Sequence, residues 1–183
     1  MDVVVWSASE AEHRLGPLGS RWAHTQAVAR RARAIAVVVA IEDRPTLLAA
    51  AYLHDIGYAP DLARTGFHPL DGAIWLRERQ RERLARLVAH HSGARYEAAV
   101  RGLVDPLARF AEESSPVADA LTYCDLTTGP DGASISVASR LADIERRYGP
   151  SSLVAQAIDA AADTLRAAVA RTEGRLAGCS PVV

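Results

Sequence analysis

The sequence predicts an all-α domain, and three observations lead to that expectation. Apolar residues recur at helical spacing along most of the chain, and several of these stretches begin at Ser or Pro and end near Gly. No run of residues alternates convincingly in the manner of a β-strand. With 183 residues, 49% of them hydrophobic, the chain is long enough for one domain with a sizeable core. We therefore expect residues 1–183 to form a single domain.

The expected helix boundaries follow from residues that favour helix ends. Ser20 is a suitable N-cap, and Pro45 suits a first helical position, where its missing N–H costs no hydrogen bond. Gly57 is placed to stop the helix that Pro45 opens. Residues 1–19 are expected to form a short apolar segment and a loop. The stretches expected to be helical are about 20–41, 45–55, 68–76, the segment around 84–91, a short piece of 94–114, 115–125, 137–148 and 152–177.

Five of the six histidines lie at or near expected helix ends, each beside an apolar packing face. An imidazole or carboxylate there is costly to bury unless something pairs with it, and a divalent metal ion would do so. Neutral imidazoles and carboxylates together suit Fe, Mn, Co, Ni or Zn. The set of candidate ligands contains His24, His54, Asp55, His68, His90, His91 and Asp125.

Helix geometry restricts how neighbouring members of this set act together. Adjacent residues in a helix point about 100° apart. His54 and Asp55 therefore share a metal only if it lies beside the helix end, where the two oxygens of Asp55 could also bridge to a second ion. By the same reasoning His90 and His91 are not equivalent, so that one faces the metal and the other faces the substrate or the core.

The order of His24, His54-Asp55 and Asp125 resembles the H…HD…D signature of the HD superfamily of metal-dependent phosphohydrolases. HDIG at 54–57 is the form common in bacterial members. HPLDGA, which contains His68, and VAHHSGAR, which contains His90 and His91, resemble the extra-histidine segments of binuclear HD proteins. The resemblance covers about residues 20–130. It implies a helical bundle around a metal site. The helices expected over about 137–177 lie beyond the resemblance and would be additional to that bundle.

The resemblance also implies residue roles. One metal would be held by His24, His54, Asp55 and Asp125, and a second by Asp55, His68 and His90. The chain departs from the family pattern at Tyr58, where many HD hydrolases carry a phosphate-binding lysine, and it lacks the GYP motif of cyclic-di-GMP hydrolases. Arg95 would supply the positive charge instead, unless it is only a surface arginine. Asp55, His91 and Arg95 are accordingly the candidate catalytic residues.

The expected activity is hydrolysis of a small phosphate ester or anhydride, a nucleotide in particular, with one or two divalent metal ions activating water. Two alternatives remain open from the sequence. Some HD proteins are di-iron oxygenases, and the missing lysine is compatible with that chemistry. A module that binds metal or nucleotide without turnover is the second alternative.

Composition limits the partners and the location. The formal net charge is −1, so we expect no nucleic-acid partner. All 21 basic residues are arginine, so no lysine can act as a base or bind phosphate. No apolar run is long enough for a membrane helix, and the N-terminus lacks the features of a signal peptide. We expect a cytoplasmic protein without a membrane partner. The apolar faces of 137–177 would pack on the core or form a homodimer contact.

Overall fold

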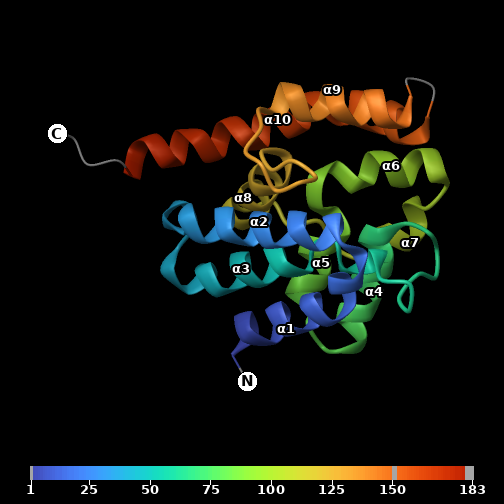
Figure 1. Ribbon diagram of the computed structural model, residues 1–183, viewed down its shortest axis with the longest axis horizontal. Coiled ribbons are helices and arrows are strands. Elements are labelled where there is room, and N and C mark those ends of the chain that lie inside the picture. Colours follow the sequence, from blue (N-terminus) through green and yellow to red (C-terminus); the bar gives the residue numbers. More distant parts are fainter. Residues whose placement is uncertain (1, 150–151, 180–183) are drawn as a thin grey trace.

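The computed structural model describes residues 2–149 and 152–179, and within them it contains helices and no β-strand. The all-α prediction is confirmed. An isolated antiparallel bridge joins Thr128 to Ser134 in the loop before the last two helices. The α-helices, shown in Figure 1, are α1 (Val3–Leu15), α2 (Ser20–Ala34), α3 (Arg44–Leu53), α4 (His68–Glu78), α5 (Glu82–His90), α6 (Ala94–Arg101), α7 (Val104–Ala108), α8 (Pro116–Leu126), α9 (Val137–Tyr148) and α10 (Leu153–Cys179).

The helix α1 was not predicted, because residues 1–19 were expected to form only a short apolar segment and a loop. Asp2 caps this helix by accepting hydrogen bonds from the backbone N–H groups of Val4 and Val5. Three consecutive valines have low helix propensity, and packing overrides it. Trp6 stacks on Trp75 of α4 with ring centroids 5.8 Å apart. The helix is therefore stabilised mainly by tertiary contacts.

The second helix ends earlier than the sequence indicated. It was expected to reach about Ile41, but α2 stops at Ala34, and a 3₁₀ turn over Ala36–Val38 follows. The β-branched residues 37–39 lose side-chain freedom in an α-helix, which favours a break at this point. The turn buries Val38 while Val37 remains 47% exposed.

The main core surrounds α3, which packs against α1, α2, α5 and α8. Its alanines at 49–51 are fully buried and let neighbouring helices approach closely. Because α3 ends at Leu53, the next two residues, His54 and Asp55, emerge in the middle of the molecule. Burial of α3 thus carries the His-Asp pair into the interior.

The last two helices lie along one side of the molecule (Figure 1), and α10 packs on α6, α8 and α9. Leu126 of α8 and Leu165 of α10 belong to a second, smaller apolar cluster. Arg171 and Arg175 of α10 form ion pairs with Asp119 of α8 at 2.6 and 2.9 Å. The expected packing of this segment on the core is therefore present for α10.

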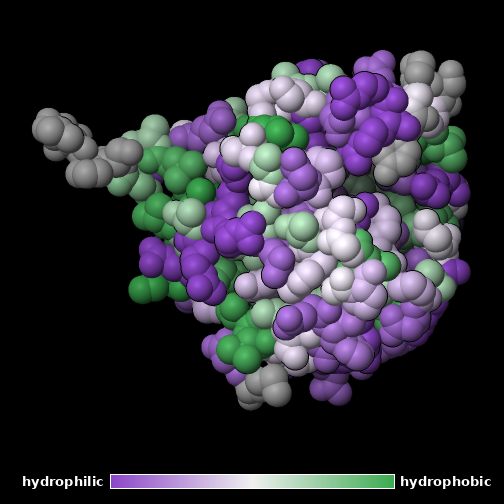
Figure 2. All heavy atoms as spheres, in the orientation of Figure 1, coloured by the Kyte–Doolittle hydropathy of each residue, from purple (hydrophilic) through white to green (hydrophobic). Residues whose placement is uncertain are grey.

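Figure 2 shows a mainly hydrophilic face, with hydrophobic side chains gathered at the end of the molecule where the turn after α2 lies. Val37 and Ile41, which are 47% and 74% exposed, belong to this end. In the described part of the chain, no helix combines the length and the apolar character needed to cross a membrane.

Candidate metal centre

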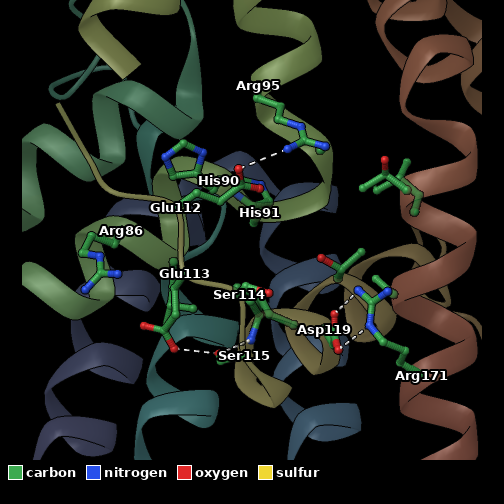
Figure 3. Close-up of a pocket in the computed structure, with 18 residues that line it drawn as sticks. Arg86, His90, His91, Arg95, Glu112, Glu113, Ser114, Ser115, Asp119 and Arg171 are labelled. Atoms are coloured by element: carbon green, nitrogen blue, oxygen red, sulfur yellow. Dashed lines mark hydrogen bonds and ion pairs between the residues drawn. The ribbon is translucent and has the colours of Figure 1, made fainter. Parts of the chain in front are cut away.

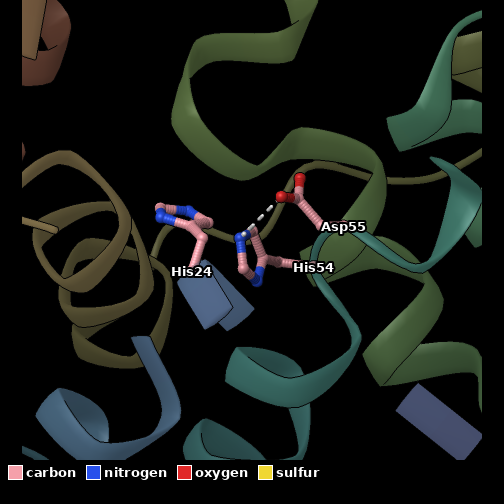
Figure 4. Close-up of side chains that lie close together, drawn as sticks. All are labelled: His24, His54 and Asp55. Atoms are coloured by element: carbon pink, nitrogen blue, oxygen red, sulfur yellow. Dashed lines mark ion pairs between the residues drawn. The ribbon is translucent and has the colours of Figure 1, made fainter. Parts of the chain in front are cut away.

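Three side chains from α2 and the end of α3 converge in the interior (Figure 4). One ligand atom from each of His24, His54 and Asp55 lies within 4.8 Å of the others. His24 lies in the second turn of α2, His54 caps α3, and Asp55 follows it at the start of a 3₁₀ turn. All three residues are buried.

Asp125, near the end of α8, adjoins this group. Its Oδ1 lies 3.0 Å from His24 Nε2 and 4.0 Å from His54 Nε2. Its Oδ2 accepts a hydrogen bond from the Ser92 hydroxyl at 2.5 Å. The four residues expected to hold the first metal are therefore neighbours in space, although Asp125 is far from the others in the sequence.

A second group contains Asp55, His68 and His91, again with ligand atoms within 4.8 Å of one another. Asp55 Oδ1 lies 3.3 Å from His68 Nε2 and 4.0 Å from His91 Nε2. Asp55 Oδ2 lies 3.4 Å from His54 Nε2, on the side of the first group. The Asp55 carboxylate thus stands between two sets of imidazoles.

The orientation of the imidazoles is set by backbone carbonyl groups. A carbonyl oxygen only accepts, so each bonded Nδ1 must be the donor, and the Nε2 atom faces the centre. In His54 and His91 the acceptor is the carbonyl three residues earlier, which is a free acceptor at a helix C-terminus. The three bonds are His54 to Ala51 at 2.9 Å, His91 to Val88 at 2.6 Å and His24 to Gly129 at 2.9 Å.

The chemistry of this donor set fits a divalent metal ion. His54 Nε2 is buried and has no hydrogen-bond partner among the described residues, so its lone pair is available. Complete burial lowers the pKa of His54 to about 4, which keeps the ring neutral at pH 7. A neutral, fixed imidazole is the form that binds metals.

The carboxylates are equally prepared to act as ligands. Burial alone would raise the pKa of Asp55, but the neighbouring His54 and the Arg21 guanidinium hold it well below its usual value. Arg21 Nη1 donates to Asp55 Oδ2 at 2.7 Å. In Asp125 burial again opposes ionisation, and the hydrogen bond from His24 together with the nearby histidines lowers the pKa. Both acids are therefore anionic at neutral pH.

The HD domain family model matches residues 21–165 of the chain. The chain belongs to the HD domain family. Neither the curated proteins nor the solved structures contain a match to it. HD domain proteins bind divalent metals and are generally metal-dependent phosphohydrolases. The match includes both histidine groups and Asp125, and it continues through α9 into α10.

The positions of His90 and His91 are the reverse of those expected from the sequence. The second group was expected to contain His90, but the structure places His91 there. His90 is the last residue of α5, and its Nε2 donates to the carbonyl of Phe110 at 2.6 Å. The chain leaves helical geometry at His91, with φ −59° and ψ 148°, and this change turns the ring of His91 toward Asp55. Figure 3 shows His90 among the residues that line a separate pocket, described below.

Arg95 also lies outside the metal centre. It was expected to face the phosphate, but its guanidinium pairs with Glu112 at 3.2 Å and hydrogen-bonds Tyr96 (Figure 3). It lines a cavity of about 340 Å³ together with His90 and one side of His91. A different cavity of about 170 Å³ is lined by His24, Asp55, His68 and His91, and Arg95 is not part of it. The phosphate-binding role expected for Arg95 is therefore not supported by its position.

Three arginines that sequence reasoning did not select line the metal-side cavity, namely Arg21, Arg140 and Arg147. Arg21 lies one helical turn before His24, and that i, i+3 spacing could have identified it. Its guanidinium also lies 3.9 Å from the ring centre of Tyr58, the residue found where the family lysine was expected. Tyr58 in turn stacks on His68 at 3.9 Å. Arg140, from α9, is far from the other site residues in sequence, and no local pattern pointed to it.

Proposed function

We propose that this HD domain is a metal-dependent phosphohydrolase that acts on a small phosphate ester or anhydride at a binuclear centre. The observation that carries the proposal is the position of Asp55. One of its oxygens faces His54, and the other faces His68 and His91. A carboxylate with an oxygen toward each histidine group is suited to bridge two metal ions.

The first ion would be held by His24, His54, Asp55 and Asp125, and the second by Asp55, His68 and His91. When bound, such ions polarise a phosphoryl oxygen and lower the pKa of water from 15.7 to about 7 in the most favourable zinc sites. The metals compatible with these ligands are Fe, Mn, Co, Ni and Zn.

The chain's own residues orient the centre and balance its charge. The Ser92 hydroxyl donates a hydrogen bond to Oδ2 of Asp125, which restricts rotation of this carboxylate. The Arg21 guanidinium neutralises part of the negative charge at Asp55 and lines the cavity that a phosphorylated substrate would enter. Positive charge in a buried cavity stabilises the oxygens of a transferring phosphoryl group.

Cavity size favours a compact substrate. A volume of about 170 Å³ is below the usual range of roughly 300–1,000 Å³ for ligand pockets. A small phosphomonoester would fit largely inside, whereas a nucleotide would place its phosphate in the cavity and its base outside. Nucleotides remain within the proposal on that basis.

The test is phosphate release by protein reconstituted separately with Mn, Fe, Co, Ni and Zn. Substrates would include p-nitrophenyl phosphate, small sugar phosphates and nucleoside mono-, di- and triphosphates. We expect turnover in at least one metal form and its loss in His54→Ala. The matched control is His13→Ala, because His13 is exposed and outside both groups.

Metal-loaded protein without phosphate release on any substrate would contradict the proposal. Oxygen consumption by the iron form, without phosphate release, would instead indicate the HD-type oxygenase. Tight binding of a nucleotide without either reaction would indicate a non-catalytic module.

A further inference from the structure

Arg140 is a buried arginine with unused hydrogen-bond donors. It lies in the first turns of α9 and is 8% exposed. Its Nε and Nη1 atoms are buried, and neither has a hydrogen-bond partner within residues 2–149 and 152–179. Its Nη2 lies 3.8 Å from Asp125 Oδ1, which is close enough for charge attraction but too long for a hydrogen bond.

The unused donors of Arg140 require an acceptor. A guanidinium group stays protonated in proteins, so it cannot avoid the cost of burial by becoming neutral. Buried polar groups without partners are rare in native proteins, and each has a structural or functional reason. A bound anion is the simplest acceptor that would satisfy this side chain.

The position of Arg140 shows where that anion would lie. Arg140 lines the same cavity as His24, Asp55 and Asp125. The other two arginines of this cavity are engaged: Arg21 is bonded to Asp55, and Arg147 forms an ion pair with Asp143 at 2.9 Å. Arg140 therefore offers donors that are not engaged by the protein, directly beside the proposed metal ligands.

We propose that Arg140 binds the phosphoryl group of the substrate and that α9 thereby supplies the anion-binding residue of the site. This inference rests on the proposed function, since it assumes a phosphorylated substrate. The planar guanidinium group presents paired N–H donors that match two phosphate oxygens. Arg140 would thus supply the positive charge for the phosphate that was expected from Arg95.

The remainder of the cavity indicates what is attached to the phosphate. Ile144 of α9 and Val154 and Ile158 of α10 line it, so part of its wall is apolar. An apolar or aromatic group next to the phosphate would lose contact with water against these side chains. The substrate class is thus a compact phosphomonoester with an apolar or planar organic part.

The inference is tested by calorimetric titration of the metal-containing protein with inorganic phosphate and with phenyl phosphate. Arg140→Gln is expected to weaken phosphate binding at least tenfold, because a charge-assisted pair is lost. Arg146→Gln is the matched control: Arg146 lies on the same helix, its side chain is 79% exposed, and it pairs with Asp143. We expect this control to bind phosphate as the wild type does.

Phenyl phosphate is expected to bind more tightly than inorganic phosphate, and Ile158→Ser should remove that difference. Arg140→Lys keeps the charge without the planar fork and should weaken phosphate binding severalfold. It provides the comparison if Arg140→Gln does not fold. Unchanged phosphate affinity in the folded variants, or no phosphate binding by the wild type, would overturn the inference.

Turnover measured in parallel separates this inference from the proposed function. Phosphate binding that depends on Arg140, without hydrolysis of any ester, would support the anion site and contradict the hydrolase. Hydrolysis by Arg140→Gln with the KM and kcat of the wild type would support the hydrolase and overturn the anion site.

Discussion

The backbone of Gly57 lies against the carbonyl group of His68 so closely that no side chain fits between them. A Cβ placed on Gly57 would collide with the His68 carbonyl oxygen and would lie 2.6 Å from the Gly72 nitrogen. Gly57 follows the His54-Asp55 pair by two residues, and His68 begins α4. This contact joins the segment that carries the first histidine group to the helix that starts the second.

We expect Gly57→Ala to separate the two groups. The added methyl group would meet backbone atoms that cannot rotate away, and such overpacking costs about 1–3 kcal/mol or more. Urea unfolding should show this loss, and elemental analysis should show less bound metal per chain. The control is Gly174→Ala at an exposed position of α10, where the added Cβ would have no described atom within 4 Å apart from the local helix backbone, so stability should be unchanged or slightly higher. Equal stability of Gly57→Ala and wild type would contradict this interpretation.

Metal content should distinguish His91 from His90. We expect His68→Ala and His91→Ala each to lose one of two bound ions, because each removes an imidazole that faces Asp55. His90→Ala should retain both ions and lose only about 1 kcal/mol of stability with its bond to Phe110. Elemental analysis of the three purified variants provides the measurement. Loss of metal from His90→Ala alone would restore the assignment made from sequence.

Substitutions of Arg21 and Arg95 should have different effects on kcat/KM. Arg95 pairs with Glu112 outside the metal centre. Arg95→Gln should therefore change kcat/KM by no more than about twofold. Arg21→Gln should lower it at least tenfold, since it removes a charge-assisted bond to Asp55. Steady-state kinetics with the best substrate of the panel would check both values. A strong defect in Arg95→Gln with normal Arg21→Gln would show that the cavity next to His90 holds the substrate.

Asp119 should make the attachment of α10 dependent on pH. Burial alone would raise the pKa of Asp119, but hydrogen bonds from Arg171 and Arg175 lower it below its usual value of 3.8. Its unfolded-state pKa is therefore the higher of the two. The stability it contributes is complete above that value and is lost as the pH falls through the folded-state pKa.

Asp119→Asn should accordingly be about 1 kcal/mol less stable than the wild type at pH 7, and the difference should shrink below about pH 4. Urea unfolding between pH 7 and pH 3 measures this, with Asp159→Asn on the exposed side of α10 as the control. A difference that stays constant down to pH 3 would exclude the ion pairs as its cause.

The helical class and most helix positions could be predicted because they depend on local properties. Ser115 and Pro116 mark the start of α8, and its N-cap bond to Ala118 is present as that pattern indicates. The N-terminal helix was missed because its valines disfavour a helix locally, and its stability comes from packing on α3 and α4.

The sequence by itself determined the kinds of side chains available to the site and their proximity to helix ends. It could not decide between His90 and His91, because one change of backbone direction at the end of α5 reverses which ring faces Asp55. Nor could it bring Arg140 to the cavity. The packing of α9 and α10 against the core places it there, and such long-range contacts leave no local pattern in the chain.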